Sequence, residues 1–234
     1  MVIGMLLPNG QTGKPEPEGG IKMVVRRTQA MIGDSAVHPT RALIIAEASE
    51  IMKRNLVASF HIDDLLAATG LTRGAIYHHF KNVEEVIDSA LAAIYVEGMN
   101  QNIELVKNVL GSAKTFEQFK DGVFRANEMY VNNDLLQVIR KLRAYAMASS
   151  ATSGELATTI ARAQQNLTTE YVAVISEAQK QGWTRSDIQP EALAVFIQAY
   201  SFGIIIDDVS ENHLDKKAWS TIIESFFEKC VFKN

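Results

Sequence analysis

Prolines are almost absent from the chain after residue 37, and this scarcity constrains the fold more than any other feature. Three of the five prolines and four of the fourteen glycines lie in the segment 8–20. No proline interrupts the sequence between Pro39 and Pro190. Aliphatic residues and alanine also outnumber aromatic residues, which make up 8% of the chain. Long stretches without a breaker favour α-helices over many short strands, so we predict an all-α protein.

Composition also sets limits on the folded region. Segment 8–20 is too rich in proline and glycine to bury a core, so we expect residues 1–37 to form a flexible tail. The single cysteine, Cys230, excludes an internal disulfide framework and a zinc site of several cysteines, and it favours a reducing, cytoplasmic location. No run approaches the roughly 18–20 uninterrupted apolar residues of a membrane span, so we expect no membrane partner.

Hydrophobic periodicity, caps and breakers divide the rest into helices. The first helix follows His38-Pro39-Thr40 and stops near Asn55, since asparagine tolerates the left-handed conformation at a helix end. The other expected helices cover residues 62–69, 72–81, 84–110, 116–131, 134–149, 153–182, 190 to about 207, and 216–232.

Residues 62–80 have the spacing of a helix-turn-helix, in which the second helix enters the major groove of DNA. We expect Leu71, Ile76 and Phe80 to lock that helix against its neighbours. The side chains left to face outward, where they suit contacts with phosphates and base edges, are Thr72, Arg73, Ala75, Tyr77, His78, His79 and Lys81. Neighbouring histidines point about 100° apart on a helix, and no cysteine or acidic ligand is nearby, so no metal site is expected.

The charges are unevenly distributed, which fits a module for a polyanion. Residues 1–82 carry nine lysines and arginines against seven acidic residues, while the remainder carries fourteen against twenty. Such asymmetry is typical of an N-terminal nucleic-acid-binding module attached to a body with another role.

A specific motif, Gly74-Ala75-Ile76-Tyr77-His78-His79-Phe80, occupies the second helix. Its flanking markers are Arg41, Ile44 and Ala48 in the first helix, Ile62-Asp63-Asp64-Leu65, and Thr69-Gly70-Leu71-Thr72. Over residues 40–91 this pattern resembles the DNA-binding domain of TetR-type transcriptional regulators. The resemblance implies that Tyr77 and His79 contact phosphates and that Arg41 touches the DNA backbone. It also implies that Thr72, Arg73 and Ala75 reach bases or phosphates.

The sequence departs from that family at three positions. Val83 stands where a lysine is common, which removes a phosphate contact for which Lys81 is the candidate substitute. The glycine usual after the first helix is replaced at Asn55-Leu56, and His61 replaces the threonine that usually caps the second helix.

The resemblance further implies that the rest of the chain forms a homodimer. Residues 190–206 are apolar nearly all round, so this helix must be buried on several faces. An intramolecular core is the alternative to a subunit interface. The residues assigned to the interface are Phe196, Ala199, Tyr200, Gly203, Trp219, Ile223, Phe226 and Phe227.

The middle helices are expected to hold an effector pocket, with a plain core as the alternative. The candidate residues are Phe119, Phe124, Met129, Tyr130, Arg140, Arg143, Tyr145, Met147 and Tyr171. Arg140 and Arg143 either turn inward to hold an acidic or phenolic effector, or form ion pairs or a solvated face.

These features predict a helix-turn-helix DNA-binding domain over residues 38–83 and a helical ligand-binding and dimerisation domain over 84–234. The expected function is that of a homodimeric repressor that a small-molecule effector releases from palindromic double-stranded operator DNA. A regulator without such an effector, controlled by a protein partner or acting as an activator, is one alternative. An all-helical enzyme is another, although the sequence offers no glycine-rich phosphate loop, metal cluster or paired nucleophile and base. No cofactor is expected.

Overall fold

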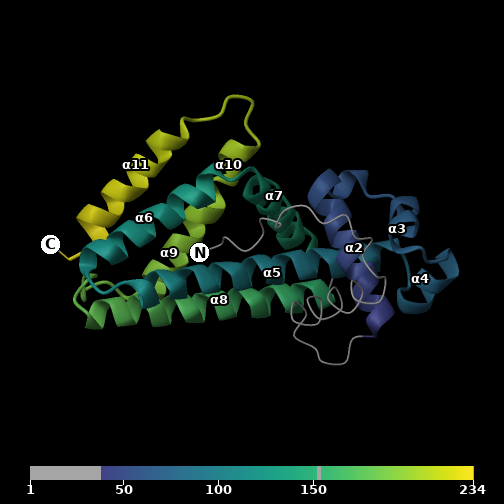
Figure 1. Ribbon diagram of the computed structural model, residues 1–234, viewed down its shortest axis with the longest axis horizontal. Coiled ribbons are helices and arrows are strands. Elements are labelled where there is room, and N and C mark those ends of the chain that lie inside the picture. Colours follow the sequence, from purple (N-terminus) through teal and green to yellow (C-terminus); the bar gives the residue numbers. More distant parts are fainter. Residues whose placement is uncertain (1–37, 152–153, 234) are drawn as a thin grey trace, which may run out of the picture.

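The structure is a computed structural model that describes residues 38–151 and 154–233. The predicted tail lies outside these residues. The all-α prediction is confirmed, because the described residues form helices with a single isolated β-bridge between Thr184 and Phe232. Figure 1 shows an elongated molecule with a small group of helices at one end and a larger helical body at the other.

Three helices make up the small end, and their boundaries agree closely with the prediction. They are α2 (Pro39–Asn55), α3 (Ile62–Thr69) and α4 (Arg73–His79), with a short 3-10 turn, η1 (Val57–Ser59), after α2. The Thr72 hydroxyl accepts a hydrogen bond from the backbone N–H of Ala75 at 3.2 Å and so caps α4. Gly70, with φ of 68°, makes the turn between α3 and α4.

One turn differs from the prediction. The residue with positive φ after α2 is Leu56, at φ of 60°, and not Asn55, which stays helical. The Leu56 backbone N–H donates to the carbonyl of Met52, which closes the last turn of α2. A non-glycine residue therefore takes a conformation for which glycine is favoured.

The body consists of longer helices. They are α5 (Val83–Ser112), α6 (Phe116–Asn132), α7 (Asp134–Ser149), α8 (Gly154–Lys180), α9 (Pro190–Gly203), the single turn α10 (Ile205–Asp208), and α11 (Lys216–Phe226), which ends in a π-type turn, η2 (Phe227–Val231). The expected helix over residues 190–207 is thus divided after Gly203. Helices α5 and α8 lie side by side along the long axis of the molecule (Figure 1).

Two hydrophobic clusters hold these helices together. The first joins α2, α3 and α4 to the N-terminal half of α5, with Ile44, Leu65, Ile76 and Val86 completely buried. The second lies at the far end of the body and includes Phe119 and other residues of α6, α8, α9 and α11. The first cluster crosses the predicted domain boundary at residue 83, so the helix-turn-helix packs directly on α5.

Candidate nucleic-acid interface and candidate ligand cavity

Helix α4 lies at the surface at the small end of the molecule (Figure 1). Ile76 and Phe80 are buried beneath it and Leu71 is half-buried, as the sequence predicts. The outward side chains are the exposed Thr72, Arg73, Tyr77, His78 and Lys81 and the partly exposed Ala75 and His79. The seven candidate residues are thus all at least partly exposed around α4 and its two ends, and we call this exposed region the α4 face.

An ion pair crosses from this surface to α3. The guanidinium of Arg73 lies 2.5 Å from the carboxylate of Asp63, and both side chains are more than half exposed. Asp63 marked the family resemblance but was not among the predicted contact residues. A carboxylate at this distance fixes the direction of the Arg73 side chain before any DNA arrives.

Arg41 lies in a different environment from the one predicted. Its guanidinium lies 4.1 Å from the centre of the Phe80 ring, donates to the carbonyl of His79 at 3.0 Å, and lies 3.5 Å from the carboxylate of Glu85. These contacts involve the two terminal nitrogens, and the side chain is 24% exposed. Arg41 thus holds the end of α4 against α2 and α5, and its contact with the DNA backbone stays a prediction.

Three histidines gather at the end of α4. The His79 ring lies 4.8 Å from that of His38 and 5.1 Å from that of His78, measured between ring centres. The pKa of His79 is lowered, first by burial and then by the charges of His38, His78 and Arg41. A nearby phosphate would act in the opposite direction, so the proton affinity of His79 is expected to respond to a polyanion.

The start of α5 explains the departure at Val83. The Asn82 side chain caps α5 by accepting from the N–H of Glu85, and Glu85 accepts from the N–H of Lys81 at 2.8 Å. Val83 packs against the first cluster, where an apolar side chain is favoured. Lys81 is exposed two residues earlier and supplies a cation at the same corner.

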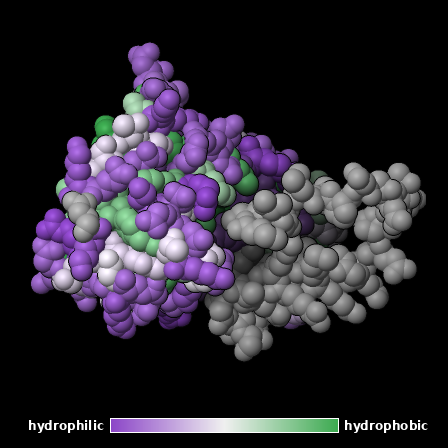
Figure 2. All heavy atoms as spheres, turned by 60° about the vertical axis from the view of Figure 1, so that its left-hand side comes forward, coloured by the Kyte–Doolittle hydropathy of each residue, from purple (hydrophilic) through white to green (hydrophobic). Residues whose placement is uncertain are grey.

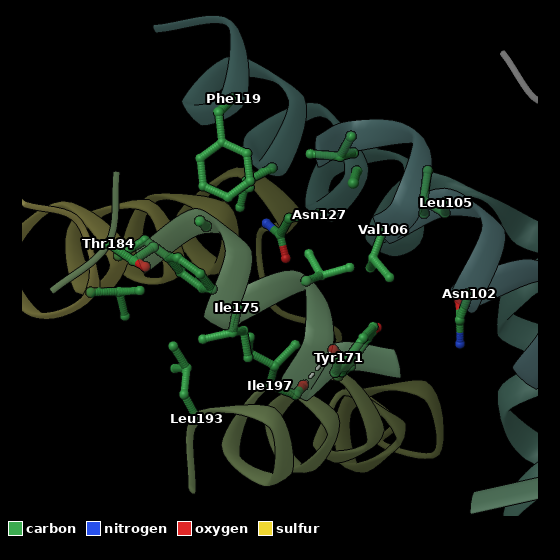
Figure 3. A pocket seen from close by; sticks show the side chains of 18 of the residues that line it. Asn102, Leu105, Val106, Phe119, Asn127, Tyr171, Ile175, Thr184, Leu193 and Ile197 are labelled. Atoms are coloured by element: carbon green, nitrogen blue, oxygen red, sulfur yellow. Dashed lines mark hydrogen bonds between the residues drawn. The ribbon is translucent and has the colours of Figure 1, made fainter. Parts of the chain in front are cut away.

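The body contains a cavity of about 130 Å³ between α5, α6, α8, α9 and the C-terminal segment. This volume is far larger than the roughly 10–15 Å³ that one water requires. Figure 3 shows a lining that is mainly aliphatic and aromatic, with residues such as Leu105, Phe119 and Ile197. None of the described residues that line it is a lysine, arginine, histidine, aspartate or glutamate.

The cavity includes three of the nine predicted pocket residues, Phe119, Tyr130 and Tyr171. The other six lie elsewhere. Phe124, Arg140 and Arg143 are at least partly buried outside the lining, and Met129, Tyr145 and Met147 are exposed. Asn127 and Thr184 also line the cavity and were not predicted, although a polar residue on the buried face of an amphipathic helix is a signal that fits Asn127.

Among the residues that the structure describes, three buried polar atoms of the cavity wall have no hydrogen-bond partner. They are Nδ2 of Asn127, the hydroxyl of Tyr130 and the hydroxyl of Thr184. Figure 3 shows Asn127 and Thr184 among the apolar side chains of the lining. Buried polar groups in native proteins are nearly always paired, so these atoms require partners, which water or a bound molecule with polar groups would supply. Burial also raises the pKa of Tyr171 to about 12, so its hydroxyl stays protonated at neutral pH.

The two arginines of α7 behave differently. Arg140 is buried and forms an ion pair with Asp208 of α10, with 2.6 Å from Nε to the carboxylate, and it also donates to the carbonyl of Tyr130 at 2.7 Å. Arg143 is buried with no carboxylate partner among the described residues. Among those residues, no three His, Cys, Asp or Glu side chains are arranged to hold a metal ion.

An apolar surface remains exposed on α9 and α10. Val195, Phe196, Ile206 and Val209 are between 43% and 72% exposed. Ala192, Phe196, Ala199 and Gly203 follow one another at spacings of three and four residues, which places them on one side of α9, and Ile206 is exposed in the following turn, α10. We call this surface the α9 stripe. Figure 2 shows apolar surface surrounded by polar residues on the end of the body away from the helix-turn-helix.

Of the predicted interface residues, Phe196, Ala199 and Gly203 lie on the α9 stripe. The Phe226 ring packs on that of Phe196, with 4.7 Å between ring centres. Trp219 is partly exposed. The remaining three residues face inward, because Ile223 and Phe227 belong to the second cluster and Tyr200 and Phe227 line the cavity.

By length and composition alone, the stretch Pro190–Asp208 could cross a membrane, and 17% of its apolar window is buried. The sequence-based prediction that no stretch approaches a membrane span thus did not take account of Pro190–Asp208. Helices of this composition also occur in protein cores, so the observation is weak evidence for a membrane.

No protein-family model matches the chain. Its fold is similar to that of many solved structures. One is a candidate transcriptional regulator from Saccharomonospora viridis in complex with choline, with 17% identity over 83% of this chain and 98% of that one and a TM-score of 0.65. Another is a TetR-family regulator from Cytophaga hutchinsonii, with 20% identity over 83% and 95% of the two chains and a TM-score of 0.60.

A third similar structure is the reduced form of E. coli NemR, with 13% identity over 84% of this chain and 98% of that one and a TM-score of 0.60. These matches extend over nearly the full length of each solved chain. The chain therefore has the fold of the TetR-family transcriptional regulators. The fold expected from the motif at residues 74–80 is confirmed.

Proposed function

We propose that this protein is a TetR-type transcriptional regulator that binds double-stranded DNA through the α4 face. The observation that carries the proposal is the make-up of that surface. Arg73, Tyr77 and His78 are exposed on one short helix, Lys81 is exposed just after it, and no acidic residue lies between Thr72 and Lys81. Arginine and lysine suit phosphates and guanine edges, and the second helix of a helix-turn-helix is the one that enters the major groove. In this proposal residues 38–83 bind DNA and residues 84–234 bind effector and partner.

We further propose that the α9 stripe joins two copies of the chain. Alanine and glycine at Ala192, Ala199 and Gly203 allow close approach of a second helix, and Phe196 offers a large apolar side chain between them. An interface on a two-fold axis uses the same surface on both copies, which suits a self-complementary apolar stripe. Two α4 helices about 34–36 Å apart would then read the halves of a palindromic site.

The cavity is proposed as the site of a small-molecule effector that releases the protein from DNA, which makes the protein a repressor. Its unpaired polar atoms support this role, as does the choline bound to the structurally similar S. viridis protein. An effector changes DNA affinity only through its different affinities for the DNA-bound and free conformations. Cytoplasmic location follows from this function.

Selection of bound DNA from a random library tests the proposal. We expect enrichment of one palindromic sequence by the wild-type chain, and loss of that enrichment in the triple variant Arg73→Ala, Tyr77→Phe, His79→Ala. Small molecules are then screened for release of the selected DNA in a gel-shift titration. Failure of the wild type to enrich any sequence contradicts DNA recognition, while enrichment with no releasing molecule favours a regulator controlled in another way.

A further inference from the structure

Arg143 is a buried cation whose charge no carboxylate of the described residues balances. The residue is 8% exposed, and its Nε has no hydrogen-bond partner among the described residues. Its Nη2 makes a weak contact of 4.0 Å with the sulfur of Met99, and its guanidinium interacts with the hydroxyls of Tyr95 and Tyr130, where it offsets part of the rise in pKa that burial causes. Its guanidinium carbon lies 5.7 Å from the centre of the Tyr95 ring. Arg140, one turn earlier, has in contrast a complete ion pair with Asp208. An unpaired buried charge destabilises a fold, so its presence points to a ligand.

The charge of Arg143 lies next to one end of the cavity. Its side chain passes over Gly98 of α5 and reaches Met99, and Asn102, one helical turn further on, lines the cavity. Tyr130, another lining residue, lies beneath the neighbouring Arg140, 5.1 Å from its guanidinium carbon to the ring centre. The charge of Arg143 also opposes the rise that burial causes in the pKa of Tyr130 and of Tyr171. The end of the cavity that is lined by Asn102, Tyr130 and Tyr171 is thus the end nearest to the positive charge of Arg143.

The unpaired atoms of the wall favour the same kind of ligand. The amide Nδ2 of Asn127 only donates hydrogen bonds, and the hydroxyls of Tyr130 and Thr184 can donate. A carboxylate offers acceptors to donors of this kind, whereas a trimethylammonium group offers none. Within residues 38–151 and 154–233, no carboxylate lines the cavity to balance a cation. The rest of the lining requires an apolar body.

We propose that the cavity binds a small apolar molecule carrying a carboxylate, and that Arg143 determines this preference by balancing the negative charge at the Asn102 and Tyr130 end. This inference rests on the proposed function, because it names the chemical class of the proposed effector. It also sets this chain apart from the structurally similar S. viridis protein, whose bound choline is a cation.

Binding of matched probes to the full chain tests the inference. The probes are carboxylates of increasing size, from benzoate through phenylbutyrate to decanoate, each compared by calorimetry with its neutral amide and with a trimethylammonium compound of the same apolar body. We expect the best acid to bind at least about tenfold more tightly than its amide or ammonium counterpart, as for a charge-assisted interaction in a buried site.

Two variants test whether Arg143 causes the preference for acids. Arg143→Met removes the charge at nearly constant volume and is expected to weaken acid binding roughly 10- to 100-fold while leaving amide binding unchanged. Arg125→Met removes the same charge from an exposed position on α6 and is expected to change neither. Without ligand, Arg143→Met should melt at the same or a higher temperature than the wild type, because the unbalanced charge is gone. If Arg143 only stabilised the fold, Arg143→Met would melt at a lower temperature than the wild type.

The inference is overturned if the ammonium or amide probes bind as tightly as the acids. It is also overturned if Arg143→Met keeps full affinity for the acids, or if no acid in the series binds. Each of these results leaves the proposed function standing as long as the wild type still enriches a DNA sequence and another small molecule releases it. Failure to enrich any DNA defeats the proposed function and leaves the probe affinities as a separate measurement.

Discussion

Arg73 in the first turn of α4 and Asp63 in the first turn of α3 form an ion pair that joins the two helices of the helix-turn-helix, with 2.5 Å between guanidinium and carboxylate. The pair is exposed, so it contributes little to stability. It holds Arg73, the only arginine on α4, in one direction at the proposed DNA-binding surface. We therefore expect the ion pair to affect which DNA sequence the protein prefers.

The first prediction distinguishes the effect of the direction of the Arg73 side chain from the effect of the net charge near it. Arg73→Ala should weaken binding to the preferred sequence by about 1–3 kcal/mol and relax the preference at one base pair. Asp63→Asn should shift the preference at the same base pair while changing unfolding stability by no more than about 0.5 kcal/mol. Asp64→Asn is the control, because Asp64 is exposed beside it and has no ion pair with Arg73. Equal effects of the two aspartate variants would show that only net charge matters.

The second prediction concerns Tyr77, which is 44% exposed on α4. Tyr77→Phe removes a hydroxyl proposed to contact phosphate, and it should weaken binding to specific and nonspecific DNA by the same factor, worth about 0.5–1.5 kcal/mol. Tyr145→Phe is the control, since Tyr145 is exposed to a similar extent on the body. Gel-shift titrations with two DNA sequences give the result, and a change in sequence preference would exclude a pure phosphate contact.

The third prediction is a pH dependence that acts through His79. Its pKa in the free protein is lowered from 6.5, and a bound phosphate should raise it, so DNA binding should take up a proton. Affinity is therefore expected to increase as pH falls through and below 6.5, by at most about tenfold per pH unit for one proton. His79→Asn should remove this part of the pH dependence. If the slope is unchanged in that variant, His79 does not contact phosphate.

Unfolding stability should change in the opposite direction over the same range. A folded-state pKa below that of the unfolded chain means that the unfolded chain binds more protons near pH 6.5. The contribution of His79 to stability is thus complete above pH 6.5 and is lost as pH falls through the lowered pKa. Urea unfolding of the wild type and of His79→Asn between neutral and mildly acidic pH measures the difference.

The fourth prediction concerns the buried ion pair of Arg140 and Asp208, whose side chains are 4% and 5% exposed. Asp208→Asn leaves a second uncompensated arginine in the body and should destabilise the fold by about 3–5 kcal/mol. The double variant Arg140→Met with Asp208→Leu removes both charges and should recover most of this loss. Equal stability of the single and double variants in urea would rule out this account of the pair.

The fifth prediction tests the α9 stripe as the proposed dimer interface. Phe196→Glu places a charge in the middle of the stripe and should convert the protein to a monomer in sedimentation experiments, with a loss of affinity for palindromic DNA. Tyr145→Glu introduces the same charge at an aromatic residue of similar exposure outside the stripe, and it should leave the assembly intact. A monomeric wild type would contradict the proposed dimer directly.

Local sequence signals were sufficient to predict the helices, because caps and breakers act over a few residues. Thr72 caps α4, Gly70 turns the chain before it, and Asp134–Ser149 forms a helix with the predicted bounds. The division of the apolar helix after Gly203 was not predicted, because the sequence shows no proline there. Leu56 takes the positive φ instead of Asn55, since the position of the residue in the turn outweighs its intrinsic preference.

Contacts between distant segments could not be predicted in the same way. The role of Arg41 depends on Phe80 and Glu85, which lie about forty residues further along the chain. The cavity combines Asn127 of α6 with Thr184 of the loop after α8, and no periodicity links the two. From the sequence, the aromatic and methionine residues of α6 and α7 were equally good candidates for the pocket. Packing decided that Tyr130 faces inward while Tyr145 and Met147 face solvent.

Helix α5 is unbroken over 30 residues, from Val83 beneath the helix-turn-helix to Ser112 beyond the cavity. Asn102, at the proposed carboxylate end, lies about 28 Å along the helix axis from Val83 at 1.5 Å per residue. The helix can thus act as a lever arm. A tilt of about 5° at the cavity would displace its far end by about 2.5 Å, a sizeable fraction of the 5.4 Å helical pitch. A small ligand could in this way set the spacing between the two DNA-reading helices of a dimer without touching either of them.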